Sequence, residues 1–285
     1  MTFEPILPTS GVLGFRLLEQ TEATQRAIYD RRPEIARDTA YFRENIANVS
    51  TAAELVADRR LLRVALGAFG MDDQLNKGAF MRRILEEGTE SSTAFATRFV
   101  DPRFTRIAEA FGFGNLIGSQ TARPGFADEI TAAYTERQFE IAVGEQDDSL
   151  RLALNFRREI ERYATASDPN GNAWFSAMGD VPVRTVFEGA FGLPSSFGQI
   201  DIDLQRDTLR DLNQKYFDDT SLAVFQDPTK VNQIIERFLL RETLNNGPSP
   251  TTPGFAALTL LGVSSGGVGP VSLQNIVLSN FRPSL

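Results

Sequence analysis

Apolar residues recur at steps of three and four along most of the chain, and runs of strict apolar–polar alternation are scarce. Steps of three and four place side chains on one face of an α-helix, whereas alternation is typical of a strand. The pattern predicts helices near residues 12–28, 33–46, 79–85, 128–164 and 204–216, the fourth with a break at residues 144–148. Thr51 and Glu54 form a capping box that predicts a further helix start. We therefore expect an all-α protein.

Four segments share one plan, in which a short apolar stretch precedes an aspartate and a helix then runs to a phenylalanine. The segments are Asp58 to Phe69, Asp101 to Phe111, Asp180 to Phe191, and Asp227 to Phe238. An aspartate that starts a helix can accept hydrogen bonds from the free first-turn amides and faces the positive end of the helix dipole. We interpret the segments as four copies of one helical unit.

Three of these segments close on Ala-Phe-Gly followed by an apolar residue. They are Ala68–Met71, Ala110–Phe113 and Ala190–Leu193. Glycine adopts the left-handed conformation without strain, so each glycine is expected to stop its helix while the next apolar residue folds back on the last turn. An apolar residue four positions before each phenylalanine predicts a stripe that faces the core, formed by Ala65, Ile107, Phe187 and Ile234.

The spacing between the copies is unequal, which argues against a regular solenoid. We expect an irregular helical bundle with internally repeated units in two lobes. The predicted divisions are an N-terminal helical lobe at residues 1–140, a C-terminal helical lobe at residues 141–247, and a tail at residues 248–285 that contains Gly, Ser and Pro.

The tail contains a single charged side chain, Arg282, and two Gly/Ser/Pro stretches that break regular structure. The spacing of Leu273, Ile276, Val277 and Phe281 predicts an apolar stripe on a short terminal helix. We expect this stripe to dock back on the body, because free apolar patches favour aggregation.

The composition excludes several chemistries. The chain has no cysteine and no histidine, which removes thiol nucleophiles, Ser-His pairs and imidazole or thiolate metal ligands. Its net charge of −8 disfavours nucleic acid and anionic lipid as general partners. Residues 1–5 do not resemble the start of a secretory signal, and no apolar run is long enough to span a bilayer, so we expect neither a cleaved signal nor membrane insertion.

Arginine dominates the basic residues. Of the 29 lysines and arginines, only Lys77, Lys215 and Lys230 are lysines. The planar arginine side chain suits ion-pair networks between helices and between proteins, although a GC-rich genome also explains such a bias.

Candidate sites are weak, and we assign no catalytic, cofactor-binding or metal-binding residue. Asp168–Asn172 begins like a calcium loop, but Ala173 and Gly179 stand where that loop needs Gly and Glu, so a turn is favoured. Acidic pairs are expected to cap helices or lie in loops; they are Asp72–Asp73, Asp147–Asp148, Asp201 with Asp203, and Asp218–Asp219. Gly112, Gly114 and Gly118 lack dinucleotide-binding spacing.

One enzymatic alternative is a carboxylate-based peptidoglycan hydrolase. Glu90-Ser91 is similar to the Glu-Ser start of the lysozyme-like lytic transglycosylases, which are largely helical. The Gly-Ala-x-Gly turn of that family should follow the glutamate, but here it precedes Glu90 at residues 67–70 or follows it only at residues 189–192.

The run from Glu44 to Gly70, together with the Asp-Pro-Arg-Phe and Ala-Phe-Gly segments, resembles an uncharacterised bacterial family of helical proteins over about residues 10–245. Members of that family are commonly found beside flagellar components. The resemblance implies a non-enzymatic structural or assembly protein of the flagellum that acts through protein–protein contacts, without a cofactor. It implies a location in the cytoplasm, or in the flagellum without a cleaved signal. A cytosolic regulator or chaperone is a further alternative.

Overall fold

The computed structural model describes residues 3–246. Within this range the chain forms twelve α-helices, five short 3₁₀ helices and no strand, which confirms the all-α prediction. The break predicted near residues 144–148 separates two long helices, α7 and α8. The α-helices are α1 (Gly11–Tyr29), α2 (Pro33–Asn45), α3 (Ala52–Ala57), α4 (Arg59–Ala68), α5 (Gly78–Glu87), α6 (Pro102–Phe111), α7 (Phe126–Gly144), α8 (Asp148–Ala164), α9 (Asn172–Gly179), α10 (Val181–Phe191), α11 (Ile202–Phe217) and α12 (Pro228–Asn246).

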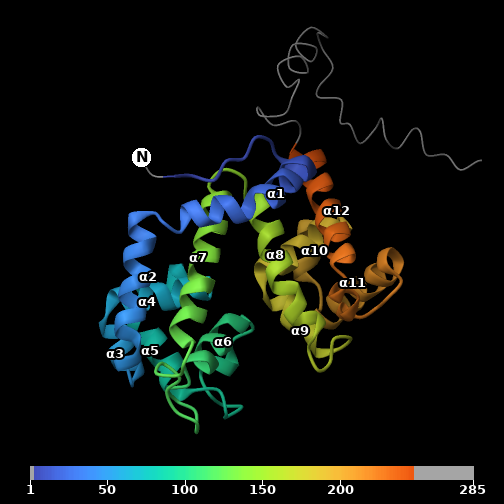
Figure 1. Cartoon of the computed structure of the whole chain (residues 1–285). Helices are drawn as coiled ribbons and strands as arrows, with labels where there is room; N and C mark the ends of the chain where they lie inside the picture. Colours follow the sequence, from blue (N-terminus) through green and yellow to red (C-terminus); the bar gives the residue numbers. More distant parts are fainter. Residues whose placement is uncertain (1–2, 247–285) are drawn as a thin grey trace, which may run out of the picture.

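The helices gather in two groups that lie side by side (Figure 1). In the first group α4 packs on α2 and α7, and in the second α10 packs on α8 and α12. Helix α1 runs across the top of both groups and contacts α7, α8 and α12. Helices α7 and α8 pack against each other, so each group contributes one long helix to the junction between them.

A tyrosine contact shows that the two groups are copies of one arrangement. The Tyr41 hydroxyl of α2 donates a hydrogen bond to Asp58 Oδ2 over 2.7 Å, and the Tyr163 hydroxyl of α8 donates one to Asp180 Oδ2 over 2.9 Å. In both cases the two residues are 17 positions apart, and the aspartate stands directly before the central helix of its group. The pairs α2–α4 and α8–α10 are therefore equivalent.

The third helix of each group also has an equivalent place. A Cβ atom added at Gly67 of α4 would lie 2.7 Å from the ring of Tyr134 in α7, and one added at Gly189 of α10 would lie 2.6 Å from the ring of Phe238 in α12. Three residues after each ring, Arg137 and Arg241 place a guanidinium group beside the glycine that ends the central helix. Helices α7 and α12 thus cover the central helices in the same way.

These contacts correct the predicted fourfold repeat. Phe238 lies in the middle of α12, which continues to Asn246, so the fourth segment does not end at its phenylalanine. The helix of the fourth segment, α12, covers α10 as α7 covers α4. It is therefore equivalent to α7 and not to α6, the helix of the second segment. The first and third segments occupy equivalent places in the fold. The second and fourth segments have the same local sequence signals, but their helices pack in different places.

The predicted helix ends agree with the structure in the two equivalent copies. Gly70 and Gly192 have φ angles of +68° and +70°, in the left-handed region. The Met71 amide donates to the Leu66 carbonyl and the Leu193 amide to the Glu188 carbonyl, each over 2.9 Å, which is the Schellman pattern. The predicted core stripe is also confirmed, since Ala65, Ile107, Phe187 and Ile234 are all buried.

The buried apolar side chains form one continuous core that extends through both groups. Helix α7 continues to Gly144, four residues past the lobe boundary predicted at residue 140. The predicted tail at residues 248–285 and its apolar stripe lie outside the described residues. None of the described helices combines the length and apolar character that crossing a bilayer requires.

Candidate functional site

The most concentrated polar cluster of the described residues lies at the junction of the two groups and centres on Glu159 of α8. Its carboxylate is bound by Arg106 of α6, with Nη1 to Oε2 at 2.5 Å, and by Arg137 of α7, with Nη2 to Oε1 at 2.6 Å. Arg158 of α8 also binds the Glu159 carboxylate. The same arginine forms a bidentate ion pair with Glu140 of α7, at 2.8 and 2.9 Å. All of these side chains are buried or nearly so. The cluster therefore ties three helices together.

Asp180 connects this cluster to α10. It stands at the position predicted for a capping aspartate, but its carboxylate accepts from the Tyr163 hydroxyl and lies 3.6 Å from Arg106 Nη2. Asp58 and Asp101 do cap their helices by accepting from first-turn amides. The cap prediction is confirmed for these two, and Asp180, also the N-cap residue of its helix, has the side chains of Tyr163 and Arg106 as additional partners.

The environment shifts the pKa values of Glu159 and Asp180 in opposite directions. Burial alone would raise the pKa of Glu159, but the charges of Arg106, Arg137 and Arg158 outweigh it and lower that pKa to about 2. Burial and the neighbouring negative charge of Glu159 raise the pKa of Asp180. Glu159 is consequently fixed as an anion, the form that holds the arginines in place.

A small cavity of about 130 Å³ opens onto this cluster between the loop after α4 and helices α6, α7, α8 and α10. Its wall contains as many arginines as carboxylates; the charged residues are Asp72, Arg103, Arg106, Arg137, Glu140, Arg151, Glu159 and Asp180. Among residues 3–246 no group of three or more Asp and Glu side chains is arranged to hold a metal ion. Since its carboxylates face arginines, the cluster is built to fasten helices.

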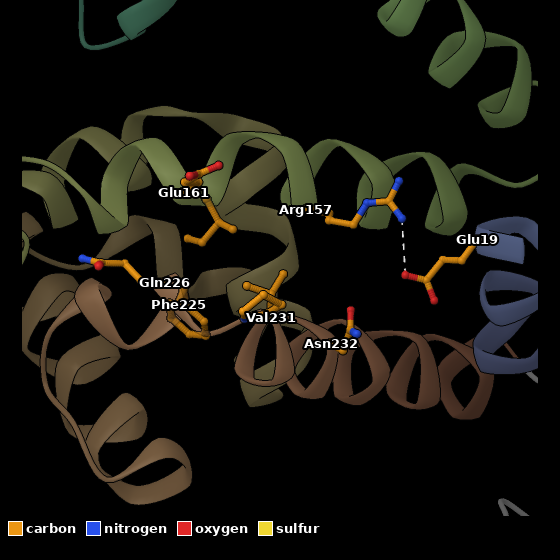
Figure 2. Close-up of a pocket in the computed structure, with 9 residues that line it drawn as sticks. Glu19, Arg157, Glu161, Phe225, Gln226, Val231 and Asn232 are labelled. Atoms are coloured by element: carbon orange, nitrogen blue, oxygen red, sulfur yellow. Dashed lines mark hydrogen bonds and ion pairs between the residues drawn. The ribbon is translucent and has the colours of Figure 1, made fainter. Parts of the chain in front are cut away.

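A second hollow, of about 350 Å³, runs between α8 and α12 and is closed at one side by α1 (Figure 2). Its apolar lining includes Ile160, Phe225 and Val231, and polar side chains complete it. On the α1 side Arg157 pairs with Glu19, Nη1 to Oε1 at 3.3 Å, and with Glu22 at 2.5 Å. The arginine joins α8 to α1, and its charge is already balanced.

A third hollow, of about 440 Å³, separates α6 from α8 and α9. Asp168 lies on its wall and accepts from the Asn172 amide over 2.8 Å. The Asp168–Asn172 segment is thus the turn that leads into α9, as its sequence favoured. Buried Trp174 of α9 donates from Nε1 to the Thr220 carbonyl over 3.0 Å and fixes this end of the helix.

The acidic pairs are not brought together. Asp147 and Asp201 accept from first-turn amides of α8 and α11, Asp72 and Asp73 begin a 3₁₀ turn, and Asp219 accepts from the Ser221 amide within its loop. Each pair therefore lies at a helix end or in a loop, as predicted from the sequence.

Glu90 lies in the exposed loop after α5, and its Oε1 accepts from the Leu116 amide over 2.9 Å. Leu116 belongs to the loop after α6, the same loop that contains Gly112, Gly114 and Gly118. Two separate sequence features thus meet at one place, which the sequence did not predict.

The sequence does not predict the buried cluster around Glu159 either. The excess of arginine indicated ion-pair networks between helices, but nothing in the spacing of Arg106, Arg137 and Glu159 shows that three different helices bring them together. Their meeting depends on how α6 and α7 pack on α8.

The fold and this junction define a class of protein: an all-α protein in which two equivalent three-helix units share an arginine-bound carboxylate. The chain belongs to the family described as "Protein of unknown function (DUF1217)", whose model matches residues 68–231. This confirms the resemblance to an uncharacterised helical family. An X-ray crystal structure of protein AGR_C_984 from Agrobacterium tumefaciens is similar in fold, with a TM-score of 0.68 and 25% identity over 86% of this chain and 100% of that one. No match is found among curated proteins.

Proposed function

We propose that the protein is a non-enzymatic structural or assembly protein, associated with the flagellum, that works by binding other proteins. The observation that carries this proposal is the state of its buried polar groups. Glu159 is held by arginines of three helices, and Asp180 by Tyr163 and Arg106. A carboxylate that is fixed as an anion by three arginines cannot serve as the proton donor of a glycosidase.

The outer surface supports a binding role. Several large apolar side chains are exposed at separate places on the described surface; they include Leu13, Val100, Leu116, Ile117, Val181, Ile202, Leu204 and Leu240. Apolar side chains that stay in water within a well-packed fold are the groups a partner can bury. The flagellar assignment comes from the family resemblance.

Two assays with the purified full chain test this function. Rod, hook and filament subunits of the same bacterium are immobilised separately and binding is measured by interferometry, while labelled peptidoglycan is incubated with the protein. Binding to a flagellar subunit without release of labelled sugar is expected. Sugar release that disappears in Glu90→Gln would instead support the hydrolase alternative and contradict the proposal.

A further inference from the structure

Two neighbouring apolar residues in the loop between α6 and α7, Leu116 and Ile117, are 93% and 86% exposed. We refer to them as the apolar tip. The loop lies at the end of its helix group farthest from α1 (Figure 1). Burying either side chain in a partner would be favourable because it removes apolar surface from water, so an adjacent pair left in water is a candidate anchor.

The loop that carries the tip is closed by its own backbone. The Asn115 amide donates to the Gly112 carbonyl over 3.1 Å, and the Gly118 amide to the Asn115 carbonyl over 2.9 Å. Gly112 has a φ of +68°, and a Cβ atom there would lie 2.6 Å from the Gly118 carbonyl oxygen. Phe111 is fully buried at the base of the loop. The glycines therefore allow a tight turn, and buried Phe111 fixes the start of the loop.

The loop after α5 fastens the tip from the other side. The Thr89 amide donates to Asn115 Oδ1 over 2.8 Å, and the Leu116 amide donates to Glu90 Oε1 over 2.9 Å. The backbone of Gly114 lies against that of Gly88, so closely that neither position has room for a side chain. A tip held in one shape loses little conformational freedom when it binds, which favours affinity.

The charge next to the apolar tip indicates the chemistry of the partner surface. Glu90 is exposed and has no ion-pair partner in the described part of the chain, whereas nearby Glu86 and Glu87 are paired with Arg82 and Arg83 at 2.5 and 2.7 Å. An unpaired carboxylate next to Leu116 favours a partner surface with a cation at the matching place.

We propose that the apolar tip is the anchor of a protein–protein contact, and that it enters an apolar pocket with a basic residue at its edge on another protein. This inference rests on the proposed function and specifies the contact that function uses. A second copy of the chain is disfavoured because the basic residue beside its one hollow with an apolar lining, Arg157, is already paired with Glu19 and Glu22. The other two hollows described above are lined mainly by polar and charged side chains. An anionic membrane is disfavoured by the net charge of −8 and by the position of Glu90.

A photo-crosslinking amino acid placed at Leu116 or Ile117 of the full chain, in cells that build flagella, identifies what the tip touches. The matched control is the same amino acid at Ile202 or Leu204, a second pair of exposed residues, at 46% and 55%. The expected product joins position 116 or 117 to a flagellar subunit, with none from the control positions.

The other crosslinking outcomes separate the two proposals. A product from 116 or 117 with a non-flagellar protein would support the anchor and contradict the flagellar assignment. A flagellar product from 202 or 204 alone would leave the proposed function standing and overturn the anchor. Products with lipid, with a second copy of the chain, or with nothing would overturn the anchor as well.

The affinity for the crosslinked partner provides the quantitative test. Leu116→Ser with Ile117→Ser is expected to weaken binding by about 10- to 100-fold and to leave the melting temperature unchanged, because both side chains are in water. Ile202→Ser with Leu204→Ser is expected to leave the affinity unchanged. Glu90→Gln keeps an acceptor for the Leu116 amide but removes the charge, so it should weaken binding most at low salt. Equal affinity of the two double variants would overturn the anchor.

Discussion

Glu159 is the residue on which the junction depends most. In Glu159→Gln the guanidinium groups of Arg106, Arg137 and Arg158 keep their buried positions but lose the negative charge between them. Removal of one partner from a buried ion pair costs about 3–5 kcal/mol, because the remaining charge is uncompensated. We expect a loss of this size in the free energy of unfolding, measured by urea denaturation.

A surface ion pair is the control for this variant. Glu136 binds Arg26 at 2.9 Å, and both side chains are about one-third exposed. Exposed pairs contribute at most about 1 kcal/mol, so Glu136→Gln should unfold almost as the wild type does. A similar small loss in Glu159→Gln would contradict the assigned role of the cluster.

The pH dependence of stability gives a second test of Glu159. Its pKa falls from an ordinary 4.5 to about 2 in the folded protein. A lowered pKa contributes stability that is fully present above the unfolded value and is lost as pH falls through the folded one. The advantage of the wild type over Glu159→Gln should therefore shrink by about 3 kcal/mol as pH falls from above 5 to near 2. A constant advantage over this range would contradict the pKa assignment.

Tyr41 and Tyr163 make the same contact in different surroundings. Tyr163→Phe removes the hydroxyl that donates to buried Asp180 and should cost about 1–3 kcal/mol of unfolding free energy. Tyr41→Phe should cost less, because Asp58 keeps its bonds from the Arg60 and Leu61 amides. Thermal denaturation of the two variants checks the order, and the reverse order would contradict it.

At the scale of the elements, the glycines under α7 and α12 set how closely the helices approach. In Gly189→Ala the new Cβ atom would lie 2.6 Å from the Phe238 ring. Overpacking of this kind costs about 1–3 kcal/mol, partly offset by the better helix propensity of alanine. We expect a net loss in the urea midpoint.

A second substitution shows whether that loss comes from the contact with α12. Phe238→Leu removes part of the ring that meets residue 189, so Gly189→Ala should cost less in a Phe238→Leu background than in the wild type. Equal losses in the two backgrounds would show that α10 and α12 do not meet as described.

Local sequence signals predicted most of the elements. The Asp-started helices and the Gly-ended helices depend on hydrogen bonds within a few residues of the chain, so the Asp58 and Gly70 signals were sufficient. The start of the fourth segment is predicted correctly, because the Thr229 amide donates to Asp227 over 2.8 Å. Its end is predicted wrongly, because the end of α12 depends on tertiary packing and not on a local signal.

The candidate sites show the same division. Asp168 and the acidic pairs were correctly placed in turns and at helix ends, because their contacts are local. The Glu159 cluster and the fastening of Leu116 by Glu90 join segments far apart in the sequence. Spacing along one helix carries no information about either contact, so neither was predicted.

At the scale of the whole molecule, two equivalent three-helix units share one core and are joined by α7, α8 and the Glu159 cluster. A cluster that binds α6, α7 and α8 at once should make the two units open together. A body that opens as one unit would keep α1 and the loop after α6 at a constant separation.

Native-state hydrogen exchange tests this claim most directly. In the wild type the slowest amides of α4 and α7 should exchange with the same opening free energy as those of α10 and α12, because one cooperative unit opens. In Glu159→Gln the two sets should separate. Different opening free energies for the two sets in the wild type would show two independent bodies and contradict the account.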